Sequence, residues 1–416
     1  MSKHARDRRP YVKPVTKLEL SEKNIKFRWI AIAVLLSIAV VSIGYGFSLA
    51  LRTEPGWQKV TPLSQDVNCS GDFVLMYEFD GATANPTAEY KKLETAYQGL
   101  TVSAYRLFNP EAEGTDNLYA LNRNANSPVT VAPELYSALE KILASGSRHV
   151  FLAPIQELYD PVFLSATDAE AALYDPAKDQ EQAALAREMA AFCADPQMVS
   201  LELLGDSKAC LKVSEEYLSY AEEYGIEVFL DLGWMKNAFI TDYMADALSA
   251  QGFTRGYLAS NDGFTRNLDA RGTEYNVNLF HREGNDIRMP ANLVYTGPMS
   301  IVSVRDYPMF EQDKWTYYAY EDGSFTSLYL DPADGMCRAS IDGITAYSRA
   351  LGCAEIVLKL APMFIGETFD AEALESLSKE GVESARYAGK NLVCTDENAP
   401  FQMVEEGYSL TVSNSK

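Results

Sequence analysis

The most regular pattern of apolar and polar positions surrounds a short stretch near the middle of the chain. An apolar run at residues 226–230 predicts a buried strand, and the apolar spacing of residues 243–248 is that of a helix. Gly233 lies between them and predicts a tight turn, so the pattern gives a strand, a turn and a helix. A helix start with free N–H groups can hold an anion such as a phosphate, although most units of this kind bind nothing.

The longest apolar run lies near the N-terminus. Residues 29–51 contain no charged side chain and are long enough to cross a bilayer as a helix. Lys and Arg are concentrated before this run, and the positive-inside rule then places the N-terminus in the cytoplasm and the main domain outside. The alternative is a cleaved signal peptide, because Ser48-Leu49-Ala50 is a small-x-small site, but the length of the run favours an anchor. Both alternatives export the main domain.

The remaining pattern predicts a mixed domain. Strands are expected at residues 72–79, 257–260, 275–281, 300–304 and 342–348, and helices at 86–100, 133–144, 214–224, 353–364 and 371–379. A hairpin is expected around Gly205-Asp206. Because strands and helices alternate irregularly, the fold class is α+β or mixed α/β. We expect a cytoplasmic tail (1–28), a membrane anchor (29–51), a linker (52–71) and an exported domain (72–416).

Charge separates the two ends of the chain. The 416 residues carry a net charge of −22, but the first 28 residues hold nine Lys/Arg and three Asp/Glu, a net of +6. Residues 29–416 therefore carry a net charge of −28. A surface this acidic repels nucleic acid and anionic lipid headgroups. We exclude nucleic acid as a partner of the main domain.

All six cysteines follow the apolar N-terminal run. An even number of cysteines in an exported domain is consistent with disulfides, and Cys193 and Cys210 are the best candidates for a pair. The alternative is six buried thiols. The chain contains no C-x-x-C spacing, so a zinc or redox motif has little support.

Four motifs follow one another in the exported part. The first is Leu230-Asp231-Leu232-Gly233, with Asp242 at the end of the same motif. Asp306-Tyr307 forms the second, residues 322–335 the third, and residues 117–139 an upstream fourth. In order and spacing they resemble the FAD:protein FMN transferase (ApbE-like) family, whose central motif is close to L-D-L-G-G-x-A-K-G-x-x-x-D. The resemblance covers residues 72–366, most of the exported domain.

This resemblance implies a fold and a chemistry. It implies an ApbE-like domain with a central mixed sheet, which moves the FMN half of FAD to a Thr or Ser of an exported flavoprotein and releases AMP. Magnesium would neutralise phosphate charge in such a reaction. The implied FAD-binding positions are Tyr105, Asn122, Gly233, Trp234, Ser260, Asp306 and Asp331. The implied metal ligands are Glu355 and the backbone carbonyl of Lys236, and no catalytic residue is assigned.

The chain departs from the family pattern at the positions that should carry the chemistry. The second Gly of the central motif is Trp234, its Ala is Lys236, its Lys is Asn237, and the later family His is Leu328. Trp234 could stack on a flavin or adenine ring, but a Trp after a strand is more often part of the core.

The metal-binding helix departs in the same way. The family Asp and Thr correspond to Glu355 and Lys359, within a residue or two. Residues four apart share a helix face, so these two side chains could form an ion pair where the metal would lie. Three interpretations are open: an ordinary exposed pair, a lysine that replaces the metal charge, and a pocket that has closed.

Two functions follow from these observations. The first is flavin handling, with FMN transfer from FAD to an exported flavoprotein and with magnesium if the protein is active. The second is a catalytically silent relative that binds flavin or helps a partner assemble at the membrane. Replacement of both the family His and the metal-binding Thr is the feature that separates them.

Overall fold

The computed structural model describes residues 25–50, 53–80 and 85–413. The chain divides into two compact units, with the boundary between Thr53 and Glu54. The first unit contains helix α1 (Ile25–Ala50), in which the stretch Trp29–Gly46 is long and apolar enough to cross a membrane. One apolar helix near the N-terminus is therefore confirmed. A signal sequence has the same properties, so the anchor remains a prediction, and the basic residues up to position 24 lie outside the described residues.

The second unit is built on a nine-stranded sheet of order β1-β2-β6-β7-β10-β13-β14-β15-β17. Neighbouring strands are antiparallel except β15 and β17, which are parallel. The strands are β1 (Gly56–Val60), β2 (Phe73–Phe79), β6 (Gly256–Ser260), β7 (Phe264–Asn267), β10 (Met299–Arg305), β13 (Gly343–Ser348), β14 (Glu383–Ala388), β15 (Asn391–Cys394) and β17 (Ser409–Val412). Strand β1 lies within the predicted linker and pairs with β2, so these five residues are part of the sheet.

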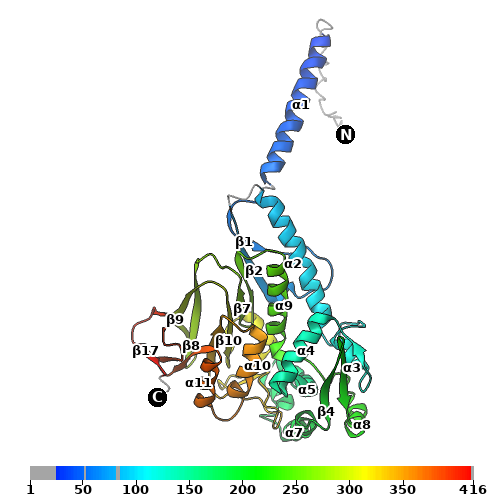
Figure 1. Cartoon of the computed structure of the whole chain (residues 1–416), viewed down its shortest axis with the longest axis vertical. Helices are drawn as coiled ribbons and strands as arrows, with labels where there is room; N and C mark the ends of the chain where they lie inside the picture. Colours follow the sequence, from blue (N-terminus) through cyan, green and yellow to red (C-terminus); the bar gives the residue numbers. More distant parts are fainter. Residues whose placement is uncertain (1–24, 51–52, 81–84, 414–416) are drawn as a thin grey trace, which may run out of the picture. The chain divides into compact units, whose positions relative to one another are not determined.

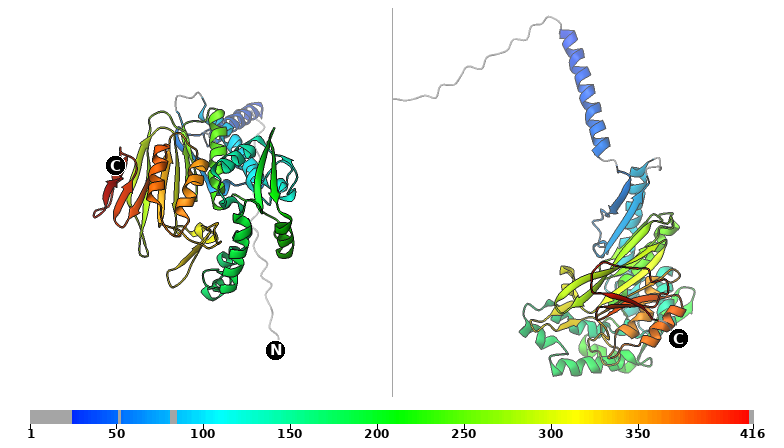
Figure 2. Two further views of the ribbon diagram at one scale, coloured as in Figure 1. Left: turned by 60° about the horizontal axis from the view of Figure 1, so that its bottom comes forward. Right: turned by 90° about the vertical axis from the view of Figure 1, so that its left-hand side faces the viewer.

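Helices cover one face of this sheet and a smaller sheet covers the other (Figures 1 and 2). The helices are α2 (Pro86–Phe108), α9 (Lys236–Ala250), α10 (Cys353–Phe364) and α11 (Ala371–Lys379). The smaller sheet, of order β16-β9-β8, contains β8 (Glu274–Glu283), β9 (Asp286–Thr296) and β16 (Phe401–Met403). Because side chains alternate along a strand, Val302 and Val304 of β10 join the helical core and Ile301 joins the core under β8 and β9.

The chain between α2 and α9 forms a smaller α/β part of the same unit. Its helices are α3 (Leu118–Arg123), α4 (Pro133–Ser145), α5 (Ala153–Leu164), α6 (Asp168–Tyr174), α7 (Gln180–Ala194) and α8 (Glu215–Tyr224). Its strands β3 (Val129–Thr130), β4 (Val199–Gly205) and β5 (Lys208–Val213) form a sheet of order β3-β5-β4. The predicted hairpin is confirmed as β4 and β5, and Asp206 and Ser207 take the positive φ values that its tight turn requires. A two-stranded hairpin, β11 (Tyr317–Ala319) and β12 (Phe325–Ser327), follows later.

The mixed fold class is confirmed, but the strand expected at residues 226–230 is wrong. This segment belongs to no strand and bends at Phe229. The backbone N–H groups of Phe229 and Leu230 donate to the Asn122 side chain, and the N–H of Asp231 donates to the Val150 carbonyl. Since these groups are already bonded, the apolar run is buried as a tethered segment and does not join a sheet.

The predicted Cys193–Cys210 disulfide is also wrong, because all six cysteines are free thiols. The Cys193 sulfur lies on α7, 3.5 Å from the Tyr217 hydroxyl. Cys210 lies in β5, opposite Glu202 of β4. Five of the six cysteines are buried, as expected of cysteine used as a small apolar side chain.

Candidate functional site

The start of α9 is the place where the family motif lies, and its backbone depends on Gly233. This glycine has φ of +53°, opens the 3-10 turn Gly233–Met235 and leads directly into α9. A Cβ at this position would collide with the side-chain amide of Gln156. The positive φ therefore favours glycine at this position, and a larger residue would also have to displace the Gln156 side chain.

Asn122 holds the segment that precedes this turn. Its Oδ1 accepts hydrogen bonds of 2.9 and 3.0 Å from the backbone N–H groups of Phe229 and Leu230. Its Nδ2 donates to the carbonyls of Leu118 and Leu230. The amide is buried and all its bonds go to backbone, so it fixes the position of the motif from α3.

Trp234 packs into the space between the turn and α10. Its indole meets the Tyr329 ring edge-on with centroids 5.1 Å apart, and Tyr329 in turn meets Phe364 of α10 at 4.8 Å. The cavity left beside this stack has a volume of about 70 Å³ and is lined by Trp234, Asp262, Arg305, Asp313, Thr316, Tyr317, Leu328 and Tyr329. Ligand pockets usually measure about 300–1,000 Å³, so this cavity is too small for a flavin ring.

Carboxyl groups gather around the start of α9. Burial raises the pKa of Asp231, and the Lys236 ammonium and the N–H groups of Leu232 and Gly233 oppose that rise. Burial also raises the pKa of Asp72, again opposed by Lys236. Lys236 therefore places its positive charge close to both carboxyl groups.

Asp262 lines the 70 Å³ cavity and accepts a 2.9 Å hydrogen bond from the Asn237 side chain. Part of this residue is exposed, but the surrounding protein desolvates its carboxyl group and raises its pKa to about 6. The hydrogen bonds from Ser260 and Asn237 oppose this rise. A carboxyl group with this pKa can take up a proton under mildly acidic conditions.

Asp242, the last residue of the family motif, ties four elements together. It is buried on α9 and accepts 2.9 and 3.0 Å hydrogen bonds from the Cys353 and Ala354 N–H groups at the start of α10. Arg266 of β7 bonds the same carboxylate at 2.7 Å, and Lys141 of α4 lies 3.8 Å from it. Asp242 thus caps α10, where a negative charge is stabilised by the exposed N–H groups of the helix.

The predicted pair of Glu355 and Lys359 does not form. Glu355 accepts a 3.4 Å hydrogen bond from the Gly352 N–H, and its carboxylate lies 3.8 Å from Lys141. Lys359 instead bonds Glu380, at 2.6 Å. No sequence pattern pointed to Lys141, because α4 is distant in the chain and only the packing of α4 against α10 brings it here.

The residues at these positions do not fit magnesium. Magnesium requires oxygen ligands close to octahedral geometry. Within the part of the chain that the structure describes, no group of three His, Cys, Asp or Glu side chains could hold a metal ion. Glu355, one predicted metal ligand, lies at the start of α10 with its carboxylate 3.8 Å from Lys141, and Lys236, whose backbone carbonyl was the other, is the first residue of α9.

The other predicted positions are spread over the domain. Asp306 follows β10 and accepts a 3.3 Å hydrogen bond from Ser327, and burial raises its pKa to about 6. Asp331 accepts the Ala333 N–H at 2.9 Å within a turn and lies 3.4 Å from Arg338. Ser260 ends β6 and accepts the Phe264 N–H at 3.0 Å. Tyr105 lies half-buried on α2, packed against the helical core.

The fold is similar to that of solved flavin transferases. The flavin transferase ApbE from Vibrio cholerae gives a TM-score of 0.53 at 12% identity, covering 80% of this chain and 93% of that one. A histidine variant of that protein gives 0.51 at 12% identity, with coverages of 85% and 97%. The ApbE protein from Thermotoga maritima gives 0.50 at 13% identity, with coverages of 85% and 97%.

The chain has the ApbE fold. The structural similarity extends over the main unit and agrees with the order of the motifs in the sequence. No protein-family model matches the sequence. No curated protein matches it either. This is a divergent ApbE-like chain, in which the fold is retained and several motif positions are replaced.

Proposed function

We propose that this protein is a catalytically silent, membrane-anchored relative of the ApbE flavin transferases, with its ApbE-like unit exported. The observation that carries the proposal is the packing of Trp234 against Tyr329, which leaves about 70 Å³ where the resemblance places the flavin nucleotide. Leu328, at the family His position, lines the same cavity and cannot transfer a proton.

The electrostatics support the same proposal. The reaction needs a cation that holds several phosphate oxygens at once, and the predicted metal positions hold Glu355 bound to Lys141 and Lys359 bound to Glu380. An ammonium group can balance one charge, but it does not organise phosphate oxygens in an octahedron. FMN transfer from FAD to an exported flavoprotein remains the second candidate, supported by the fold and by the retained motif residues around Gly233.

The test is a titration of the full chain in detergent with FAD, with and without magnesium, following flavin fluorescence and AMP release. We expect no AMP release at any magnesium concentration. Magnesium-dependent AMP release by the unmodified chain would overturn the proposal and support a transferase.

A variant separates a closed cleft from a merely weakened enzyme. Leu328→His combined with Lys359→Thr restores the two family side chains, and we expect it to remain inactive because Trp234 still fills the cleft. Lys379→Thr, an exposed change at the end of α11, is the matched control. AMP release by the double variant alone would show that the cleft is open and that only the two side chains are missing.

The anchor has a separate test. If α1 stays attached, the chain remains in the membrane after carbonate extraction and protease added outside the cell removes the ApbE-like unit. A mature protein that begins near residue 51 and washes off the membrane would identify the helix as a cleaved signal peptide.

A further inference from the structure

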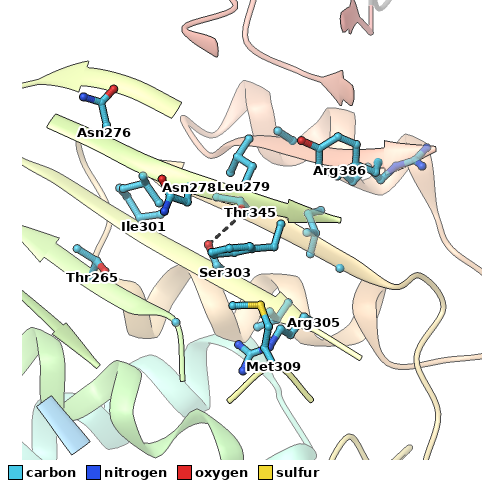
Figure 3. A pocket seen from close by; sticks show the side chains of 18 of the residues that line it. Thr265, Asn276, Asn278, Leu279, Ile301, Ser303, Arg305, Met309, Thr345 and Arg386 are labelled. Carbon is cyan, nitrogen blue, oxygen red and sulfur yellow. Dashed lines mark hydrogen bonds between the residues drawn. The ribbon is translucent and has the colours of Figure 1, made fainter. Parts of the chain in front are cut away.

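A second cavity lies on the opposite face of the nine-stranded sheet from α9 and α10. It has a volume of about 380 Å³ and is bounded by β8 on one side and by strands β6, β7, β10, β13 and β14 on the other (Figure 3). This volume is within the usual range for ligand pockets, about 300–1,000 Å³. Strand β8 is the last strand of its sheet, so its outer edge is available to form one side of the cavity.

The floor of this cavity is a patch of hydroxyl groups. Thr265, Ser303 and Thr345 come from the neighbouring strands β7, β10 and β13. Ser303 lies directly opposite Thr345, and their hydroxyl oxygens are 2.9 Å apart (Figure 3). A hydroxyl group can donate one hydrogen bond and accept others, so each retains capacity for a ligand after this contact.

The walls are aromatic. Five tyrosines line the cavity, namely Tyr257, Tyr275, Tyr295, Tyr307 and Tyr387. Tyr275 stacks on Tyr295 with centroids 5.7 Å apart and meets Tyr257 edge-on at 6.2 Å. Burial raises the pKa of Tyr295 and of Tyr307 to about 12, so these phenols stay uncharged at neutral pH. Tyrosine rings offer flat apolar surfaces against which another ring can stack.

Among the residues that the structure describes, the lining contains no Asp, Glu, Lys or His, although the chain has a net charge of −22. Both arginines of the lining have partners. Arg305 bonds Asp313 at 2.7 Å but leaves its buried Nε without a hydrogen-bond partner among the described residues, and the Arg386 guanidinium lies over the Phe369 ring at 4.5 Å. Because no carboxylate lines the cavity, a cationic ligand would lack a partner there.

The shape of the cavity follows from its position between two β layers. Packed sheets lie about 10 Å apart, and the side chains of their two inner faces interdigitate in this space. A flat ring can replace part of this packing and lie against the tyrosine rings. We propose that this cavity binds a planar heteroaromatic ring without a positive charge, which stacks on the tyrosine walls and bonds the Ser303 and Thr345 hydroxyls through its edge.

This proposal goes beyond the proposed function, because the cavity lies between β8 and the nine-stranded sheet, whereas the 70 Å³ cleft lies at the start of α9; Arg305 lines both. Ser260, one of the predicted FAD-binding positions, lines the larger cavity, whereas Trp234 lines the smaller one. Binding here needs neither a metal nor cleavage of a pyrophosphate. Ring binding and AMP release can therefore succeed or fail independently.

The test uses the full chain in detergent with two probes, riboflavin and adenosine, neither of which has a pyrophosphate. We expect saturable binding of at least one probe, measured by riboflavin fluorescence and by calorimetry. Thr265→Trp should fill the cavity and abolish binding. Ser303→Ala combined with Thr345→Val should weaken binding about tenfold, since each lost hydrogen bond costs about 1 kcal/mol.

A control locates the binding. Thr411→Val on β17 removes a hydroxyl outside the cavity and should leave the affinity for the probes unchanged. Binding of neither probe up to its solubility limit would overturn the proposal. Binding that survives both Thr265→Trp and the double variant would also overturn it, because the ring would then lie elsewhere. The double variant keeps the test decisive if Thr265→Trp fails to fold.

Discussion

The indole of Trp234 and the ring of Tyr329 form a T-shaped pair, with the ring centroids 5.1 Å apart and the ring planes at 80°. The two residues come from separate motifs, one at the start of α9 and one just after β12. Their contact leaves a cavity of only about 70 Å³ beside it. Whether the cleft can be reopened is therefore a question about this pair.

Removing the indole should open the cleft at a measurable cost. We expect Trp234→Ala to lower the free energy of unfolding by roughly 2 kcal/mol, because it removes a half-buried ring and an aromatic contact. Trp315→Ala is the control, since Trp315 is 61% exposed and its loss should change stability by no more than about 0.5 kcal/mol. Urea unfolding measures both. Equal effects of the two changes would show that Trp234 is not packed as described.

Asp242 should be one of the most sensitive positions of the main unit. Asp242→Asn removes the charge that Arg266 faces in a buried site, and we expect a loss of about 3 kcal/mol in unfolding free energy. Asp246→Asn is matched to it, because Asp246 bonds the same arginine at 2.8 Å but is 66% exposed. That change should cost less than about 1 kcal/mol. A larger loss for Asp246→Asn would contradict the assignment of Asp242 as the cap of α10.

The ion pairs of α10 can be separated by double-mutant cycles. Lys359 and Glu380 are 37% and 53% exposed, so we expect a coupling energy of only about 0.5 kcal/mol between them. Lys359 and Glu355 should show no coupling. A clear coupling between Lys359 and Glu355 would restore the helix pair that the sequence spacing suggested.

Asp306 should make stability depend on pH. Its pKa is raised to about 6 by burial, whereas an unfolded Asp titrates near 3.9. Between these values the folded chain binds more protons than the unfolded chain, so the Asp306 contribution to stability falls as pH rises from about 4 to 6. Asp306→Asn removes this effect and should gain roughly 2 kcal/mol relative to the unmodified chain between about pH 4 and pH 7. If the free energies of unfolding of Asp306→Asn and of the unmodified chain change with pH in the same way over that range, the pKa of Asp306 is not raised by burial.

Thiol counting tests the free cysteines. Unfolded in denaturant without reductant, the chain should react with Ellman's reagent at all six cysteines. Folded, it should react only slowly, because five of the cysteines are buried and burial raises the pKa of Cys337 to about 12. A count of four after unfolding would reveal one disulfide, and peptide mapping would then identify its partners.

The fold followed largely from local pattern, and the exceptions have a common cause. Residues 353–364 and 371–379 were predicted as helices with the bounds that the structure shows, because their apolar positions repeat with helical spacing. The apolar run at 226–230 carried the signal of a buried strand but is an irregular segment held by Asn122. The apolar pattern predicts that a segment is buried. It does not predict which groups form hydrogen bonds with the backbone of that segment.

The sequence by itself determined an apolar N-terminal helix, an acidic mixed α/β unit and a set of motifs in the order of the ApbE family. These properties depend on residue type and on spacing of a few positions, which are visible in a linear chain. Only the tertiary structure decided that Lys141, and not Lys359, faces Glu355, and that Trp234 meets Tyr329. It also brought Ser303 and Thr345 together across two strands to form the floor of a cavity. Contacts between residues tens of positions apart are set by how the layers pack, and no local pattern encodes them.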